Sequence, residues 1–184
     1  MKVIGFVGSP RKNGNIDVLV QQVLQGASAA EAETKIFYLN ELDFKGCQGC
    51  NFCKVNNRCG LQDDMTSLYD EIANAGAIVI GSPVYIGQVS GQTKLFLDRW
   101  YAFMNPDFST RLEKGKKAAL IFSQANPNAE HFGKSFASLA ELLGLSGMEI
   151  QDTLVASGVR EAGVVAGDKA LMQKAQALGE QLVK

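Results

Sequence analysis

Residues 3–15 read VIGFVGSPRKNGN, and this stretch decides the fold. Its first part, Val3 to Gly8, is a short apolar run bounded by glycine, serine and proline, which is typical of a buried strand. Asn15 can cap a helix, and apolar side chains follow it at helical spacing. The stretch therefore predicts a strand, a polar loop and a helix in direct succession.

The same alternation continues along the chain. More strands are predicted at 34–39, 77–81 and 117–122 and within 148–156, and more helices at 63–75, 92–103, 132–143 and 168–183. Alternating strands and helices favour a doubly wound parallel sheet with helices on both faces, and right-handed crossovers leave few topologies. We therefore expect one α/β domain over residues 1–184, with a flavodoxin-like five-stranded parallel sheet in the order 2-1-3-4-5.

The composition is that of an ordinary globular protein. Of the 184 residues, 46% are hydrophobic and 20% are charged, and the chain is long enough to bury a full core. The net charge of −1 provides no basic field for nucleic acid or an anionic membrane, and no apolar run reaches the roughly 18 residues of a spanning helix. The start of the chain has no signal-peptide core, so we expect a cytoplasmic protein.

The loop at the end of the first strand has the composition of a phosphate site. Ligands of such sheets bind at the carboxyl ends of the strands, at the switch point between strands 1 and 3. A serine hydroxyl, two basic side chains and the N–H groups of a helix start suit a phosphate there. The loop matches neither the P-loop nor the G-x-G-x-x-G pattern, so a monophosphate such as that of FMN fits better than a dinucleotide. An ordinary βα turn is the alternative. The candidate residues are Ser9, Arg11, Lys12, Asn13, Gly14, Asn15 and Ile16.

A second candidate loop follows the third predicted strand. It contains Ser82, Pro83, Val84, Tyr85, Ile86 and Gly87. The proline is expected to end the strand, the glycine lets the backbone approach a ligand, and Tyr85 could form one wall of a flavin site. The alternative is a turn whose Tyr85 packs on the sheet. Ser123 begins a polar loop after the fourth strand and, by its position, is expected at the rim of the same site.

All four cysteines, Cys47, Cys50, Cys53 and Cys59, lie within thirteen residues as C-x2-C-x2-C-x5-C, and we expect a cysteine-rich insertion at about 46–60. A [4Fe–4S] cluster suits three cysteines on one tight loop and a fourth that closes the site. Structural zinc usually takes two separated C-x2-C pairs and fits less well; free thiols or an adventitious disulfide are the third alternative. Because the run follows strand 2 and precedes a helix, we expect it at the same carboxyl edge as the two candidate flavin loops.

These motifs occur in a recognisable order. The phosphate loop, the cysteine run, Asp63-Asp64-Met65 and residues 81–85 are followed by Lys94 and Asp98-Arg99. Together they resemble the NADPH-dependent FMN reductase-like flavodoxin superfamily, and more narrowly its iron–sulfur flavoproteins. The resemblance implies bound FMN, with the phosphate on Ser9, Arg11, Asn13 and Asn15 and the ring against Pro83, Val84, Tyr85 and Ile86. It also implies a cluster on the four cysteines and a homodimer or homotetramer. Ile16 departs from the pattern, because such proteins often have a hydroxyl residue there.

Three functions follow as hypotheses. The first is an FMN-containing redox protein with a four-cysteine iron–sulfur site, which passes electrons from a one-electron donor such as ferredoxin to a small-molecule or oxygen-species acceptor. The alternative is an NAD(P)H-dependent FMN or quinone reductase without a cluster. An electron carrier ranks last, because the chain lacks a strongly acidic surface. No catalytic acid or base is expected, since the single histidine, His131, belongs to no recognisable triad.

Overall fold

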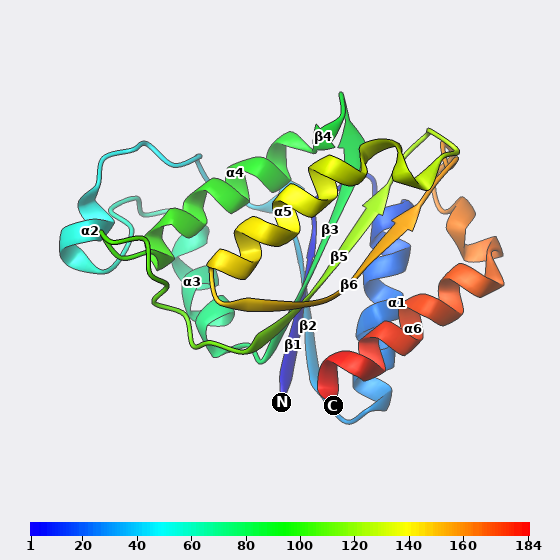
Figure 1. The fold of residues 1–184 in the computed structure, drawn as a ribbon, viewed down its shortest axis with the longest axis horizontal. Coiled ribbons are helices and arrows are strands. Elements are labelled where there is room, and N and C mark those ends of the chain that lie inside the picture. The colour runs from blue at the N-terminus through cyan, green and yellow to red at the C-terminus, as the bar shows by residue number, and fades with distance from the viewer.

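A parallel sheet runs through the middle of the computed structural model, which describes residues 1–184 (Figure 1). Its strands are β1 (Lys2–Val7), β2 (Glu33–Tyr38), β3 (Ala77–Tyr85), β5 (Lys116–Ser123) and β6 (Met148–Ala156), in the order β2-β1-β3-β5-β6. A sixth strand, β4 (Gln88–Val89), pairs antiparallel with the end of β3. The flavodoxin-like α/β prediction is confirmed, but the five-stranded order 2-1-3-4-5 is corrected to six strands, because the sequence pattern did not reveal β4.

The additional strand, β4, can form because β3 continues beyond the apolar residues from which it was predicted. Ser82 and Pro83 do not end the strand, and they lie beside Phe122 and Ser123 of β5. After Tyr85, the residues Ile86 (φ 49°) and Gly87 (φ 76°) have left-handed backbone, which suits the tight turn of a twisted hairpin. The predicted loop over 82–87 is therefore the end of a strand and the tip of a β3–β4 hairpin.

Helices cover both faces of the sheet (Figure 1). One face is covered by α1 (Asn15–Ala29) and α6 (Lys169–Val183), and the other by α3 (Met65–Asn74), α4 (Gly91–Arg99) and α5 (Gly133–Leu145). Successive side chains of a strand point to opposite faces. Accordingly, Val3 and Val7 of β1 pack with α1 and α6, whereas Ile4 and Phe6 pack in the core on the other face.

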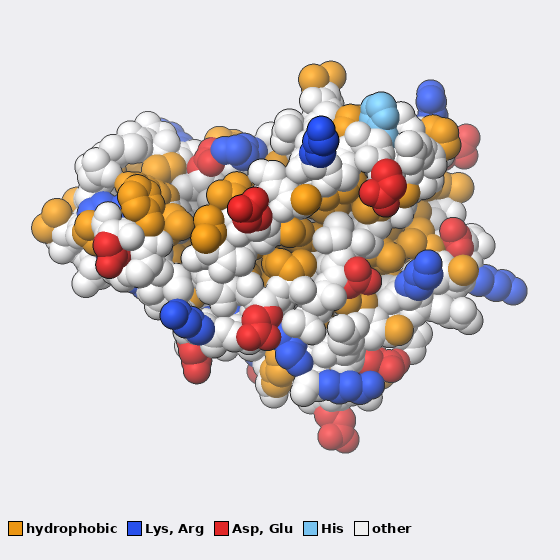
Figure 2. Space-filling view, in the orientation of Figure 1, with side chains coloured by type: hydrophobic (Ala, Val, Ile, Leu, Met, Phe, Trp, Pro, Cys, Tyr) orange, Lys and Arg blue, Asp and Glu red, His pale blue; other side chains and the backbone are white.

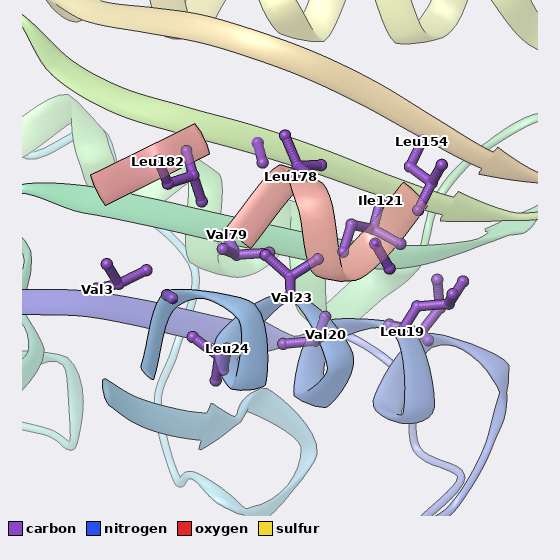
Figure 3. Packing of buried hydrophobic residues seen from close by; sticks show 14 of the residues in the cluster. Val3, Leu19, Val20, Val23, Leu24, Val79, Ile121, Leu154, Leu178 and Leu182 are labelled. Atoms are coloured by element: carbon purple, nitrogen blue, oxygen red, sulfur yellow. The ribbon is translucent and has the colours of Figure 1, made fainter. Parts of the chain in front are cut away.

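The layer of α1 and α6 is closely packed. Val20 and Val23 of α1 and Leu178 of α6 meet above the sheet (Figure 3). Two glycines allow the helices to approach: a Cβ atom on Gly26 would lie 2.0 Å from the carbonyl oxygen of Gln176, and one on Gly179 would lie 1.9 Å from that of Val23. Any side chain at either position would force the two helices apart.

Short elements complete the chain. The 3₁₀ helices are η1 (Leu39–Glu41), η2 (Trp100–Phe103), η3 (Ala129–Phe132) and η4 (Val164–Gly167), and a short helix, α2 (Phe52–Asn56), lies within the cysteine run. The helix predicted over 92–103 ends at Arg99 and continues as η2. None of the helices combines the length and the apolar character that crossing a membrane requires.

Candidate functional site

The loop after β1 presents free backbone donors. Gly14 is the N-cap residue of α1 and provides no side-chain cap, so the first N–H groups of the helix are available to a ligand. The Ser9 side chain is buried, and its Oγ accepts a hydrogen bond from the Arg11 N–H at 3.2 Å. Asn13 has left-handed backbone (φ 55°), and its N–H donates to Asp17 Oδ2 at 2.7 Å. This buried carboxylate of Asp17 fixes the loop, a role that the sequence did not reveal.

The remaining side chains of the loop are tied to neighbouring segments. Arg11 Nη1 donates to the Arg160 carbonyl at 3.3 Å, and Lys12 Nζ pairs with Glu41 at 2.5 Å. Asn15 is the first residue of α1 rather than its cap, and its Nδ2 donates to the Glu161 carbonyl at 2.8 Å. The segment after β6 therefore braces the loop from the side, with two basic side chains at its rim.

Ile16 points away from the loop. Its side chain is 1% exposed, and a Cβ atom on Gly81 would lie 2.7 Å from Ile16 Cγ2. The side chain thus fills the space under β3. Only the backbone N–H of Ile16 can serve a phosphate, which explains how an apolar residue is tolerated at a position where a hydroxyl was expected.

The predicted ring-binding segment divides into buried and exposed halves. Ser82 is fully buried, and Val84 is half-buried beside Val89 of β4. In contrast, Tyr85 is 43% exposed and Ile86 is fully exposed. Both lie at the tip of the β3–β4 hairpin, which Figure 1 places at the top of the molecule, and apolar atoms project from that region in Figure 2. The hairpin tip therefore offers the most exposed apolar side chains of this segment to a ligand.

The Ser82 hydroxyl belongs to a buried network that includes two residues not expected from the sequence. Ser90 N–H donates to Ser82 Oγ at 2.9 Å, and Thr93 Oγ1 lies 3.2 Å from the same atom. Ser90 Oγ donates to the Gly8 carbonyl at 2.5 Å and also caps α4 by accepting from the Thr93 N–H. The network joins the loop after β1 to the hairpin from below, so Ser82 could contact a ligand only through its backbone.

The loop after β5 completes this edge. Ser123 is buried at the end of β5, opposite Pro83. The next residue, Gln124, is 2% exposed; its Nε2 donates to the carbonyls of Asn126 and Asn128, while its Oε1 has no partner. The free N–H groups at the start of α1, the basic side chains of Arg11 and Lys12 and the exposed ring of Tyr85 thus suit FMN at this edge. The Oε1 atom of Gln124 is a further acceptor that has no partner.

The four cysteines line one small cavity of about 20 Å³, together with Arg99 and Tyr101. None is in a disulfide: Cys47 and Cys50 are exposed, Cys59 is half-buried, and Cys53 on α2 is buried. Four free thiols around one space are the donor set that an iron–sulfur cluster requires. In the arrangement shown, however, no three of these or other acidic, cysteine or histidine side chains are placed to hold a single metal ion.

Cations surround this cysteine lobe, defined as residues 46–60. Lys54 Nζ donates to the carbonyls of Tyr101 and Met104 at 2.8 and 2.7 Å, and burial lowers the pKa of its ammonium group. Arg111 Nη1 donates to the Cys53 carbonyl at 2.9 Å, while its Nη2 is buried without a partner. The sequence pattern did not single out Arg111.

Arg99 closes the base of the lobe. It is 1% exposed and donates to both carboxylate oxygens of Asp63, at 2.6 and 3.0 Å, and to the Lys45 carbonyl at 2.7 Å. Asp64 Oδ2 accepts from the Asp43 N–H at 2.7 Å. The two ends of the lobe are thereby held together. Burial alone would raise the pKa of Asp63, but the hydrogen bonds from Arg99 and two backbone N–H groups outweigh it and hold that pKa below its usual value.

The lobe does not share the edge of the flavin loops. It packs against η2, at the end of α4, whereas the hairpin precedes the start of α4 (Figure 1). A nine-residue helix such as α4 is about 13 Å long. The expectation that the cysteines lie at the same carboxyl edge is therefore wrong. In η1 the chain is still beside the phosphate loop, where Glu41 pairs with Lys12, but it then follows α4 from Gln92, which contacts Asn40, to Arg99, which contacts Lys45.

The profile of the family described as NADPH-dependent FMN reductase matches residues 1–159. The chain belongs to the NADPH-dependent FMN reductase family. The description of this family supports FMN as the cofactor of the chain.

Among the relatives of this chain, an iron–sulfur flavoprotein of Methanocaldococcus jannaschii is 40% identical over 99 residues. The matched region covers 54% of this chain and about half (51%) of that protein. An iron–sulfur flavoprotein of Archaeoglobus fulgidus is 28% identical over 91% of this chain and 82% of its own length. A putative NAD(P)H-dependent FMN-containing oxidoreductase of Bacillus subtilis is 26% identical over 93% of each chain. The resemblance to iron–sulfur flavoproteins is confirmed.

Solved structures agree on the fold. A flavone reductase has a TM-score of 0.76 at 18% identity and covers all of this chain and 62% of its own. An archaeal flavodoxin has a TM-score of 0.61 at 14% identity, with 100% and 96% covered. At these identities the similarity supports the flavodoxin-like fold alone.

Proposed function

We propose that this protein is an FMN-dependent redox protein that carries a [4Fe–4S] cluster on Cys47, Cys50, Cys53 and Cys59. Electrons would pass from a ferredoxin-like one-electron donor to a small-molecule acceptor. The observation that carries the proposal is the single cavity lined by all four free thiols and a buried guanidinium. Free thiols also suit the reducing cytoplasm that we expect for it.

FMN would occupy the edge formed by the loop after β1 and the β3–β4 hairpin, and when bound it supplies one- and two-electron redox chemistry. The free N–H groups at the start of α1 and the side chains of Ser9 and Arg11 would hold the phosphate. Tyr85 and Ile86 would cover the ring from the hairpin tip, where they are exposed. No side chain at this edge needs to act as an acid or base.

The cluster is tested by anaerobic reconstitution with iron and sulfide, followed by metal analysis and absorption spectroscopy. We expect about four irons per chain, which is the stoichiometry of one [4Fe–4S] cluster. Cys53→Ala should lose the iron and keep FMN, whereas Val55→Ala, an exposed position on the same helix, should keep both. A protein that binds FMN but takes up no iron under these conditions would refute the proposal.

A second candidate is an NAD(P)H-dependent FMN or quinone reductase with unmetallated cysteines. It is favoured by the similarity to the Bacillus subtilis relative, which extends over 93% of each chain. Under this alternative, NADPH should bleach the bound flavin rapidly, and replacement of all four cysteines by serine should leave that rate unchanged. A strong loss of rate in the serine variant would instead favour the cluster.

The surface suggests that the chain associates with a second copy of itself. A groove of about 490 Å³ lies between α4 and α5, and its lining includes Val89, Leu97, Trp100 and Leu139; hydrophobic atoms are exposed along it in Figure 2. Its rim carries Asp98 and Lys134, so the same patch can pair with itself across a two-fold axis.

Such pairing would also bring the two redox sites together. One end of the groove is β4, beside the flavin edge, and the other is Tyr101 and Met104, beside the cysteine lobe. A two-fold axis across the groove would place the lobe of one copy against the hairpin of the other. Leu142→Asp, at an exposed position of the groove, should convert the dimer to a monomer in analytical ultracentrifugation, whereas Gln173→Asp on α6 should not. A wild-type monomer at micromolar concentration would contradict this assembly.

A further inference from the structure

Asn15 has a buried side chain whose oxygen and nitrogen both bind backbone groups. The residue is 9% exposed and directly follows the N-cap of α1. Its Nδ2 donates to the carbonyl of Glu161 at 2.8 Å, and its Oδ1 accepts from the N–H of Val165 at 3.4 Å. Two backbone partners on one short segment fix the orientation of the amide. The side chain is therefore directed at the segment after β6 rather than at the space in front of the phosphate loop.

This connecting segment, defined as residues 158–165, runs from the end of β6 into η4. Its first residues are hydrogen-bonded to the loop after β5: the Gly158 N–H donates to the Asn126 carbonyl at 2.8 Å, and the Val159 N–H donates to the Gln124 carbonyl at 3.0 Å. Its later residues bind Asn15. The segment is thus held between two loops of the flavin edge, and it can act on the phosphate loop from a fixed position.

Two further residues of the phosphate loop meet the connecting segment. Arg11 Nη1 donates to the Arg160 carbonyl at 3.3 Å. Gly163 has left-handed backbone (φ 72°), and a Cβ atom on it would lie 3.0 Å from the carbonyl oxygen of Asn13. Alternate residues of the loop, at positions 11, 13 and 15, therefore all contact the same segment, and a side chain at 163 would crowd that contact.

The contacts of the phosphate loop extend beyond the part of the chain that the family profile matches. That match ends at residue 159, whereas the loop is held by Arg160, Glu161, Gly163 and Val165. The resemblance in sequence implies a phosphate contact for the Asn15 side chain. The hydrogen bonds of its amide favour a different role.

We propose that Asn15 is a positioning residue, which holds the phosphate loop against the connecting segment and does not itself bind the phosphate of FMN. The effect on FMN binding rests on the proposed function; the anchoring of the segment does not. The free N–H groups at the start of α1 serve an anion only while the loop keeps its geometry. A loop that is held in place before the ligand arrives also loses less conformational entropy on binding.

The first test uses Asn15→Ala, which removes both hydrogen bonds of the amide. In the FMN-free protein, peptides that cover residues 160–166 should exchange amide hydrogens several-fold faster than in wild type, because the Val165 N–H loses its acceptor. FMN affinity should fall roughly 10-fold, the effect of one lost hydrogen bond, whereas riboflavin affinity should be unchanged. Gln22→Ala is the matched control, because it removes an amide of the same helix that bonds to Gln176 on α6, and it should change none of these quantities.

The second test approaches the same contact from the other side. Gly163→Ala alters no side chain of the phosphate loop, but its methyl group meets the Asn13 carbonyl and its backbone is strained. This variant should also bind FMN more weakly and riboflavin equally well. Gly167→Ala, at the end of η4, is the matched control, because nothing lies within 4 Å of the new atom.

Each outcome decides one of the statements. Wild-type exchange of residues 160–166 in Asn15→Ala would overturn the anchoring. Faster exchange with unchanged FMN affinity in both variants would overturn the role in phosphate binding. If Asn15→Ala loses FMN affinity while Gly163→Ala does not, Asn15 contacts the phosphate directly and the positioning role is wrong. If the wild-type chain binds no FMN, the proposed function fails, and the exchange rates still decide the anchoring.

Discussion

Ser90 Oγ lies 2.5 Å from the carbonyl oxygen of Gly8 and thereby joins the two loops of the flavin edge. Gly8 directly precedes Ser9 of the proposed phosphate loop, and Ser90 directly follows β4 of the hairpin. The bond thus fixes how the start of α1 and the β3–β4 hairpin face each other. Removing this hydrogen bond therefore tests whether the geometry of the flavin edge depends on it.

Ser90→Ala should lower the free energy of unfolding by about 2 kcal/mol, because it removes the cap of α4 and leaves a buried carbonyl without a donor. FMN affinity should also fall, since the two loops lose their link. Chemical denaturation and quenching of FMN fluorescence measure the two effects. Ser90→Thr retains the hydroxyl and is the control. An alanine variant with wild-type stability would show that Gly8 finds another donor.

Arg11→Ala should weaken FMN binding by roughly 10- to 100-fold, the range of about 1.5–3 kcal/mol that a hydrogen bond to a charged group contributes. Riboflavin, which lacks the phosphate, should bind both proteins equally. Lys12→Ala should have a smaller effect, because this exposed side chain is already paired with Glu41. Equal losses for FMN and riboflavin would place Arg11 away from the phosphate.

Asp63 should give the fold a defined sensitivity to acid. Its pKa is held low in the folded protein, whereas in the unfolded chain it is near 3.9. The stability it contributes is therefore complete above about pH 5 and is lost as the pH falls through the folded pKa. Asp63→Asn should be less stable than wild type by about 3 kcal/mol at pH 7, because the buried Arg99 loses its counter-charge.

The difference between these two proteins should shrink below about pH 4, where wild type also loses the carboxylate charge. Denaturation at a series of pH values measures it. Asp70→Asn, an exposed change on the neighbouring helix, should follow wild type throughout. A difference that is independent of pH would mean that Asp63 acts through its shape rather than its charge.

Gly179→Ala should destabilise the fold by about 2 kcal/mol or more, because the new Cβ meets the backbone of α1 and overpacking of this kind costs roughly 1–3 kcal/mol. Gly144→Ala is the matched control on α5, where nothing lies within 4 Å of the new atom. It should raise stability by about 0.5–1 kcal/mol through helix propensity alone. Thermal unfolding of both variants measures the contrast.

The main elements of the fold were predictable because they are long and periodic. Apolar runs such as Val3 to Gly8 are buried wherever they lie in a parallel sheet, so local pattern and final structure agree. β4 has only two residues, and its turn depends on Ile86, a β-branched residue that rarely adopts left-handed backbone. No local pattern could indicate that hairpin.

The site was less predictable, because residue type does not determine which way a side chain points. Ser82 has the hydroxyl expected of a ligand contact, yet the alternation of β3 turns it inward to Ser90. The role of Arg99 depends on Asp63, 36 positions away in the chain, and a contact of that kind follows from tertiary packing alone. The compact cysteine spacing, in contrast, was sufficient to predict one shared cavity.

The closed base of the cysteine lobe has an evolutionary consequence. Asp43 and Asp64 meet through backbone and side-chain hydrogen bonds, so the segment between them leaves the sheet and returns to nearly the same point. Lengthening such a closed segment costs little conformational entropy. Insertions between Cys53 and Cys59 can therefore change the spacing of the thiols without disturbing the sheet. The length of the lobe and the spacing of its cysteines can therefore change during evolution while the flavin edge stays intact.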